Sequence, residues 1–120
     1  MTSGRTTDLY YILDGRKAVP VDLMTWAGWF EKNGTNTNRH VAGDTIDEVR
    51  IRTIFLGIDL ALGEGPPMIF KTRVFGGPLD QEQDHCSTWE EAEAMHARMK
   101  KRVIKAQITS SAHQLSNPDS

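Results

Sequence analysis

Two runs of alternating residues, joined by a loop rich in glycine and proline, constrain this chain more than any other feature. The apolar or threonine positions of the first run are Val49, Ile51, Thr53 and Phe55. Those of the second run are Phe70, Thr72 and Val74. The positions between them are mostly charged, and a period of two is typical of a strand with one buried face. The stretch from Asp47 to Gly77 therefore predicts two strands of an antiparallel sheet.

Pairing these two strands so that their apolar ends meet assigns each side chain to a face, although this register is an assumption. The alternating set above then packs on helices. The opposite face carries four cations and an aromatic ring: Arg50, Arg52, Lys71, Arg73 and Phe75. Residues 54–58 are apolar at almost every position, which predicts that this end of the strand is covered on both sides.

The segments on either side predict a hairpin and two helices. Asp14-Gly15 divides two short apolar runs and predicts a hairpin within residues 9–21. Asp22 is a helix N-cap signal, and the apolar spacing after it predicts a helix over 22–33, with its stripe at Leu23, Trp26, Ala27 and Phe30. A polar loop is expected over 33–46 and an acidic loop over 79–86. A capping box that starts at Ser87 predicts a second helix over 88–106.

Together these elements predict an α+β fold in the order strand–strand–helix–strand–strand–helix, with both helices on one face of an antiparallel sheet. We expect a single domain over 9–108 and flexible tails at 1–8 and 109–120. A chain of 120 residues can bury a core of its own. Its single cysteine, Cys86, excludes a disulfide within the chain and indicates a reducing compartment. We expect a cytoplasmic protein with no membrane partner, because no long apolar stretch and no signal sequence are visible.

Patterns for catalysis and metal binding are weak. His85 and Cys86 are adjacent, but a zinc site needs three or four ligands at fixed spacing, and nothing supplies the rest of a triad. His96 lies in the middle of an apolar stripe and is expected to be a core histidine with one hydrogen bond. The Gly/Pro loop at 63–67 lacks the phosphate-loop pattern. We predict no catalytic residues, no metal and no cofactor; an enzyme would require His85, Cys86, His96 and Asp59 to cluster.

The four cations and Phe75 form the sharpest candidate for a binding site. A cationic sheet that carries an aromatic ring can hold phosphates and stack a base. A protein partner and a merely solvated surface are the other two interpretations. The net charge is only −2, so any attraction for an anion requires the cations to be segregated. Trp29, at the edge of the first helix's stripe, is a further candidate contact, for which a half-buried structural position is the simpler interpretation.

Three strings in the chain resemble a widespread family of small phage and prophage proteins. They are YYILDG…PVDLMTWAGWFE, TIFLGID…GPPMIFKTRVFGG and STWEEAEAMH, and the resemblance covers residues 9–103. It implies a phage or mobile-element origin, while no functional residues can be transferred from it. The chain departs from the family at Lys71, where many relatives are expected to carry an acidic residue. That departure makes the predicted sheet face more basic.

We therefore expect a non-catalytic phage or prophage accessory protein of the host cytoplasm. It is expected to bind a host or phage macromolecule, first of all a protein, through the exposed sheet face. Inhibition of a host defence system is one specific version. Two alternatives remain open. One is a nucleotide- or nucleic-acid-binding module that uses the basic face. The other is a virion or assembly component in which residues 54–58 pack on a second copy of the chain.

Overall fold

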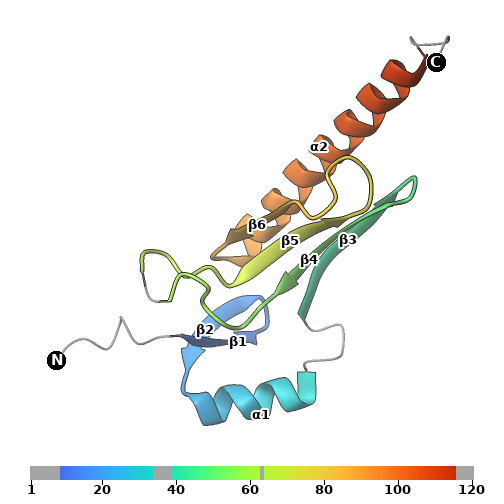
Figure 1. The fold of residues 1–120 in the computed structure, drawn as a ribbon. Coiled ribbons are helices and arrows are strands. Elements are labelled where there is room, and N and C mark those ends of the chain that lie inside the picture. The colour runs from blue at the N-terminus through green and yellow to red at the C-terminus, as the bar shows by residue number, and fades with distance from the viewer. Residues whose placement is uncertain (1–8, 34–38, 63, 116–120) are drawn as a thin grey trace.

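Two antiparallel sheets and two helices make up the fold of the computed structural model, which describes residues 9–33, 39–62 and 64–115, with side chains as far as residue 109. In chain order the elements are β1 (Tyr10–Asp14), β2 (Lys17–Val21), α1 (Leu23–Asn33), β3 (His40–Ile46), β4 (Val49–Phe55), β5 (Phe70–Phe75), β6 (Gln83–Cys86) and α2 (Trp89–Leu115). Strands β1 and β2 form a hairpin, and β3–β4–β5–β6 form a four-stranded meander. Helix α2 runs along one face of the meander (Figure 1). The predicted α+β class is confirmed.

The pairing of β4 with β5 has the register that the sequence predicted. Ile51 lies opposite Val74, Thr53 opposite Thr72, and Phe55 opposite Phe70. All of the side chains assigned to the inward face are at most 2% exposed. Alternation along the two strands thus separates a buried face from a charged one, as expected for a sheet covered on one side.

Helix α2 covers the inward face of the meander. Its buried stripe consists of Ala92, Met95, His96, Met99 and Val103. The helix begins one residue later than the predicted box, because Thr88 Oγ1 accepts from the amide of Glu91, and Glu91 Oε1 accepts from the amide of Thr88. The helix continues to Leu115, past the predicted end at residue 106.

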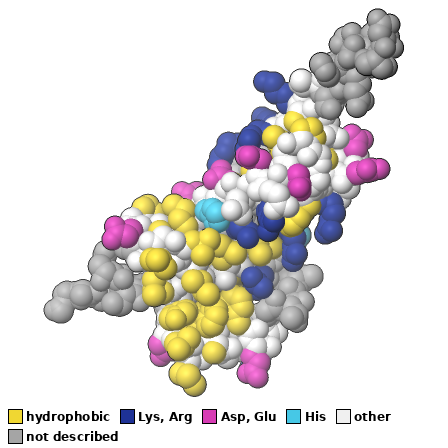
Figure 2. Space-filling view, in the orientation of Figure 1, with side chains coloured by type: hydrophobic (Ala, Val, Ile, Leu, Met, Phe, Trp, Pro, Cys, Tyr) yellow, Lys and Arg dark blue, Asp and Glu magenta, His cyan; other side chains and the backbone are white. Residues whose placement is uncertain are grey.

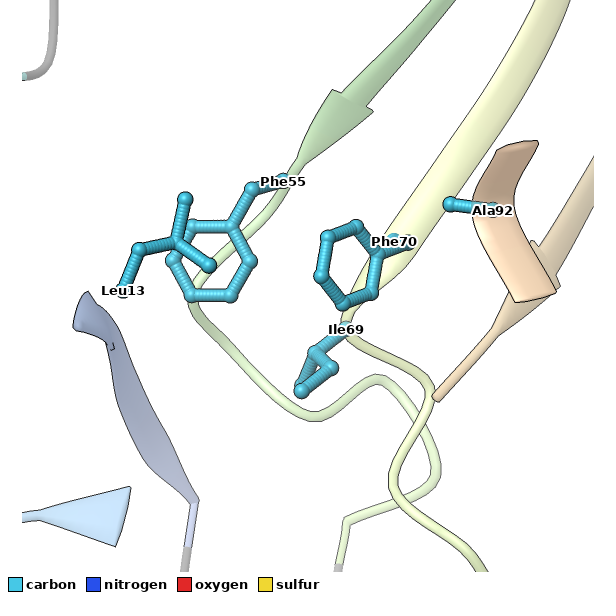
Figure 3. Packing of buried hydrophobic residues seen from close by; sticks show 5 residues of the cluster. All are labelled: Leu13, Phe55, Ile69, Phe70 and Ala92. Carbon is cyan, nitrogen blue, oxygen red and sulfur yellow. The ribbon is translucent and has the colours of Figure 1, made fainter. Parts of the chain in front are cut away.

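A cluster of buried side chains joins the hairpin to the meander and to α2. Leu13 of β1 and the rings of Phe55 and Phe70 lie together with Ile69 and Ala92 (Figure 3). Helix α1 reaches the same cluster, because the ring of Trp29 lies 5.8 Å from that of Phe55. Trp29 is thus a half-buried structural residue that packs against the core.

The hairpin and α1 cover the apolar end of β4. The amide of Tyr11 donates to the carbonyl of Gly57 at 2.8 Å, and Tyr10 forms a bridge with Ile58. Gly57 also lies against Trp26 and Phe30 of α1. The same chain therefore supplies part of the covering predicted for residues 54–58, while Ile54, Leu56 and Ile58 stay half-buried.

Two strands and one helix face differ from the sequence-based expectation. Residues 40–46, predicted within a polar loop, form β3, and residues 83–86, predicted within an acidic loop, form β6. On α1, Leu23 is 50% exposed and Ala27 is also exposed. The helix instead turns Trp26, Trp29 and Phe30 toward the rest of the chain. The large aromatic rings determine its orientation because they bury more apolar area than Leu23 or Ala27.

Residues 1–8, 34–38, 63 and 116–120 lie outside the described part, and so do the predicted tail at 1–8 and the end of the predicted tail at 109–120. Within the helices that are described, none combines the length and apolar character needed to cross a bilayer.

Gly57→Ala tests the close approach of α1 to the end of β4. An added Cβ would lie 2.4 Å from the Phe30 ring at a residue whose φ is 80°. Overpacking and the left-handed backbone both oppose it, so we expect urea unfolding to show a loss of about 2 kcal/mol or more. Gly28→Ala is the control, because a Cβ there meets nothing within 4 Å. It should stabilise the helix by about 1 kcal/mol. An unchanged stability for Gly57→Ala would contradict this packing.

Candidate functional site

The face of the meander turned away from α2, which we call the outward face, is built by four antiparallel strands, with a β-bulge or similar irregularity in β3 between His40 and Ala42. Its side chains lie in three rows that run across the strands. The first row is Thr45, Arg50 and Phe75. The second is Gly43, Arg52, Arg73 and Gln83. The third is His40, Ile54, Lys71 and His85. Neighbouring strands lie about 4.8 Å apart and the rows about 6.6 Å apart.

The predicted binding residues other than Trp29 therefore come together on one surface. Figure 2 shows Lys and Arg side chains across the middle of the view, where the meander lies in Figure 1. Hydrophobic side chains gather below them, over the hairpin and α1. Trp29 is not part of this face, because it packs edge-to-face against Phe30 and Phe55.

No outward position of the four strands carries an acid. Within the described part of the chain, the side chains of Arg50, Arg52 and Lys71 make no hydrogen bond or ion pair. The charges of Arg52 and Lys71 lower the pKa values of neighbouring basic side chains. Burial, followed by the charge of Arg52, lowers the pKa of Arg39. Burial, followed by the charge of Lys71, lowers the pKa of His85, and the charge of Asp84 opposes this shift. The outward face is thus a region of net positive charge.

Arg73 and Phe75 form a stacked pair in this face. The guanidinium carbon of Arg73 lies 5.2 Å from the centre of the Phe75 ring, and its Nη2 donates to Gln81. Phe75 is still 37% exposed. An exposed ring beside a fixed guanidinium offers a flat surface for stacking.

A hollow of about 410 Å³ opens between β3 and β4. It is lined by His40, Gly43, Asp44, Thr45, Arg50, Ile51 and Arg52. Gly43 makes the space, since a Cβ at this position would lie 3.0 Å from His40 Cε1. The carboxylate of Asp44 is engaged by His96 and Lys100.

The cations of α2 do not extend the outward face, because the helix covers the inward one. Lys100 Nζ lies 3.3 Å from Asp44, and Arg102 lies 3.1 Å from Glu82. Much of the positive charge of α2 is therefore used at its contacts with the sheet or lies on the opposite side of the molecule.

His96 is at the centre of a buried polar chain. Asp44 Oδ2 lies 2.8 Å from His96 Nε2, and His96 Nδ1 lies 2.7 Å from Thr53 Oγ1. Thr53 is in turn 2.5 Å from Thr72 Oγ1. A carboxylate only accepts, so His96 Nε2 donates to Asp44, and Nδ1 faces the hydroxyl of Thr53. Thr53 is 0% exposed, so its hydroxyl cannot reach a substrate. The predicted core histidine is confirmed, with two partners rather than one.

The other candidates for an enzyme site lie in different surroundings. His85 belongs to the outward face, whereas Cys86 lies opposite the inward Phe70. Asp59 anchors the Gly/Pro loop, because its Oδ1 accepts from the amides of Ala61 and Met68, both at 2.8 Å. Among the described side chains, no group of three His, Cys, Asp or Glu residues is arranged to hold a metal.

Sequence reasoning missed the contribution of β3 to the site, namely His40, Gly43 and Thr45. One local signal was available. Ile46 and Val49 flank the pair Asp47-Glu48, and Asp47 adopts a φ of 56° in a tight turn. Aspartate tolerates this left-handed conformation, and a two-residue turn between apolar residues is a hairpin signal.

No family model matches the chain, and comparisons with curated proteins and with solved structures find no match either. The resemblance to small phage and prophage proteins stays a prediction.

Asp44→Asn tests the buried polar chain through its pH dependence. The hydrogen bond with His96 lowers the pKa of Asp44 from its ordinary value of 3.8, burial opposes this shift, and Lys100 adds to it. A lowered folded-state pKa stabilises the fold above the unfolded-state value, and the gain is lost as the pH falls through the folded-state pKa. Urea unfolding should therefore show wild type more stable than the variant near neutral pH, with the gap closing below 3.8.

Glu31→Gln, which removes one charge from an exposed position on α1, is the control and should show no such closing gap. A wild-type advantage that persists unchanged through acid would show that the carboxylate charge of Asp44 does not strengthen the contact.

Alkylation of Cys86 tests its half-buried position. Burial, followed by the charge of Glu91, raises the pKa of the thiol from 9.0 to about 11. The thiolate is the reactive form, so iodoacetamide should react roughly 100-fold more slowly near pH 8 with the folded chain than with the urea-unfolded chain. Mass spectrometry over time measures both rates on the same single thiol. Equal rates would mean that the thiol is open and ionised normally.

Proposed function

We propose that this protein is a non-catalytic binding protein that uses the outward face to bind an anionic macromolecule. One observation carries the proposal. The outward positions of four adjacent strands hold Arg50, Arg52, Lys71 and Arg73 and no acid, in a chain whose net charge is −2. The acidic residues of the chain lie elsewhere, so the charge is segregated rather than scarce.

A solvated surface without a ligand explains this arrangement less well. Arg52 and Arg73 lie directly opposite each other on β4 and β5. Like charges in such a pair destabilise a sheet. The repulsion between these cations opposes folding, and no carboxylate on the outward positions offsets it. A bound anion would relieve this repulsion, so a binding role explains the arrangement better.

The shape of the surface favours a macromolecule over a small ligand. Four strands give a face about 14 Å across, from the usual strand spacing. The cations are spread over two strands and three rows instead of converging on one point. A ligand that meets all of them must itself be extended and carry repeated negative charge.

The phage setting comes from the resemblance and belongs to the proposal as a prediction. In that setting the macromolecule is a host or phage component, and inhibition of a host defence system is one outcome of binding it. The packing of β1 and α1 on residues 54–58 weighs against the virion or assembly role through self-association of that segment.

Retention on immobilised heparin, a generic polyanion, tests the proposed function. The test variant carries Arg50→Gln, Arg52→Gln, Lys71→Gln and Arg73→Gln. The control carries Lys17→Gln, Arg98→Gln, Lys101→Gln and Lys105→Gln, four exposed cations of other surfaces. Both variants lose the same charge. We expect wild type and control to elute at similar salt concentrations, and the test variant to elute at a distinctly lower one. The reason is that a protein with fewer cationic contacts releases fewer counterions when it binds.

Circular dichroism confirms that both variants are folded before the comparison is made. Equal loss of retention in the two variants would mean that net charge alone governs binding, and absence of retention in wild type would remove the proposed function altogether.

A further inference from the structure

We infer that the anionic partner is a single-stranded nucleic acid, with a phosphate in the hollow at Gly43 and a base against Phe75. This inference rests on the proposed function and names its partner class. It depends on two neighbouring features of the outward face. One is the cation-lined hollow between β3 and β4, and the other is the exposed ring of Phe75 on β5, directly opposite Arg50.

The hollow has the chemistry of a phosphate subsite. Arg50 and Arg52 are exposed and lie along one side of it. Guanidinium groups donate in a planar fork that matches two phosphate oxygens. On the other side, Thr45 supplies a hydroxyl and His40 an imidazole, both from β3. The one acid that lines the hollow, Asp44, is held by His96 at 2.8 Å and by Lys100 at 3.3 Å.

Gly43 gives the hollow its depth. It lies opposite Arg52 in the register of β3 and β4, so a side chain here would stand between the guanidinium and the His40 ring. The missing side chain lets a ligand approach the strand backbone closely. A glycine in the middle of a strand weakens the strand, and such a position is typical of close approach by a ligand or by another backbone.

The aromatic ring adds a contact that a simple polyanion does not need. Phe75 lies next to Arg50 across β4 and β5, one strand spacing away. Arg73 stacks on the same ring, so ring and guanidinium together offer a stacking surface. Bases stack on such surfaces with little dependence on sequence.

A single strand fits this face better than a duplex. The major groove of a duplex admits a helix or a two-stranded ribbon, whereas the outward face is the broad side of a four-stranded sheet. Sheets that bind nucleic acid through a broad face and exposed aromatics act on unpaired bases. The acidic polypeptide that could also satisfy the cations is one of the outcomes tested below.

Fluorescence anisotropy tests the inference with labelled single-stranded DNA and RNA of about 15 nucleotides. The matched duplex and a polyglutamate of equal charge are measured in parallel. We expect the single strands to bind more tightly than the duplex and the polyglutamate. For about four neutralised phosphates, the logarithm of the binding constant should fall against the logarithm of salt with a slope of about −3.

Two variants that keep the charge separate the subsites. Phe75→Leu should weaken single-strand binding about tenfold and leave the salt slope unchanged, because it removes stacking and no charge. Gly43→Ala should also weaken binding, because its Cβ crowds His40 and fills the hollow, while its backbone needs no left-handed angle. Gly28→Ala on α1 is the matched control and should bind as wild type does.

The outcomes separate this inference from the proposed function. Binding to heparin and polyglutamate that depends on the four cations, with oligonucleotide affinity no higher and unaffected by Phe75→Leu, would overturn the nucleic-acid inference and leave the proposed function standing. Tighter binding to the duplex would overturn it in the same way. Failure of every polyanion to bind would overturn both.

Discussion

The antiparallel register between β4 and β5 is the constraint on which the rest of the structure depends. It places Ile51 opposite Val74 on one face and Arg52 opposite Arg73 on the other. A slip by one residue would turn every side chain over, so that the four cations would face α2. Burying unpaired charge is far more costly than any packing gained, so the alternation allows only one register. The core and the basic surface are two consequences of the same pairing.

The buried polar chain gives β3 its place beside this pair. The strand has only seven residues, few of them strongly apolar, and forms an edge of the sheet. Asp44 of β3 is bound to His96 of α2, which is bound in turn to Thr53 of β4. A satisfied network of this kind specifies a single arrangement because each broken contact would leave a buried polar atom unpaired. His96 is buried, but it helps to position the outward face, because its contact with Asp44 holds the strand that carries Gly43, Thr45 and His40.

How much of this could be predicted from the sequence differs between elements for physical reasons. Strands β4 and β5 and the face of each of their residues were predictable, because a strand of a sheet that is covered on one side alternates strongly. The stripe of α2 around His96 and Met99 was predictable for the same reason at a helical period. Strands β3 and β6 were missed because they are edge strands whose pairing is supplied by their neighbours, and QDHC has almost no apolar pattern. The hollow at Gly43 depends on the pairing of β3 with β4, so a sequence pattern that indicates a loop over 33–46 cannot predict it.

The central claim is that the outward face, rather than the basic part of α2, meets an anionic partner. Titration of the isotope-labelled protein with a short heparin fragment, followed by backbone amide NMR, tests it most directly, because each strand and the helix report separately. The account predicts the largest chemical-shift changes for the amides of β4 and β5 around Arg50, Arg52, Lys71 and Arg73, and for those of β3 around Gly43. Changes confined to α2 around Arg98, Lys101 and Lys105, with the meander unperturbed, would contradict it.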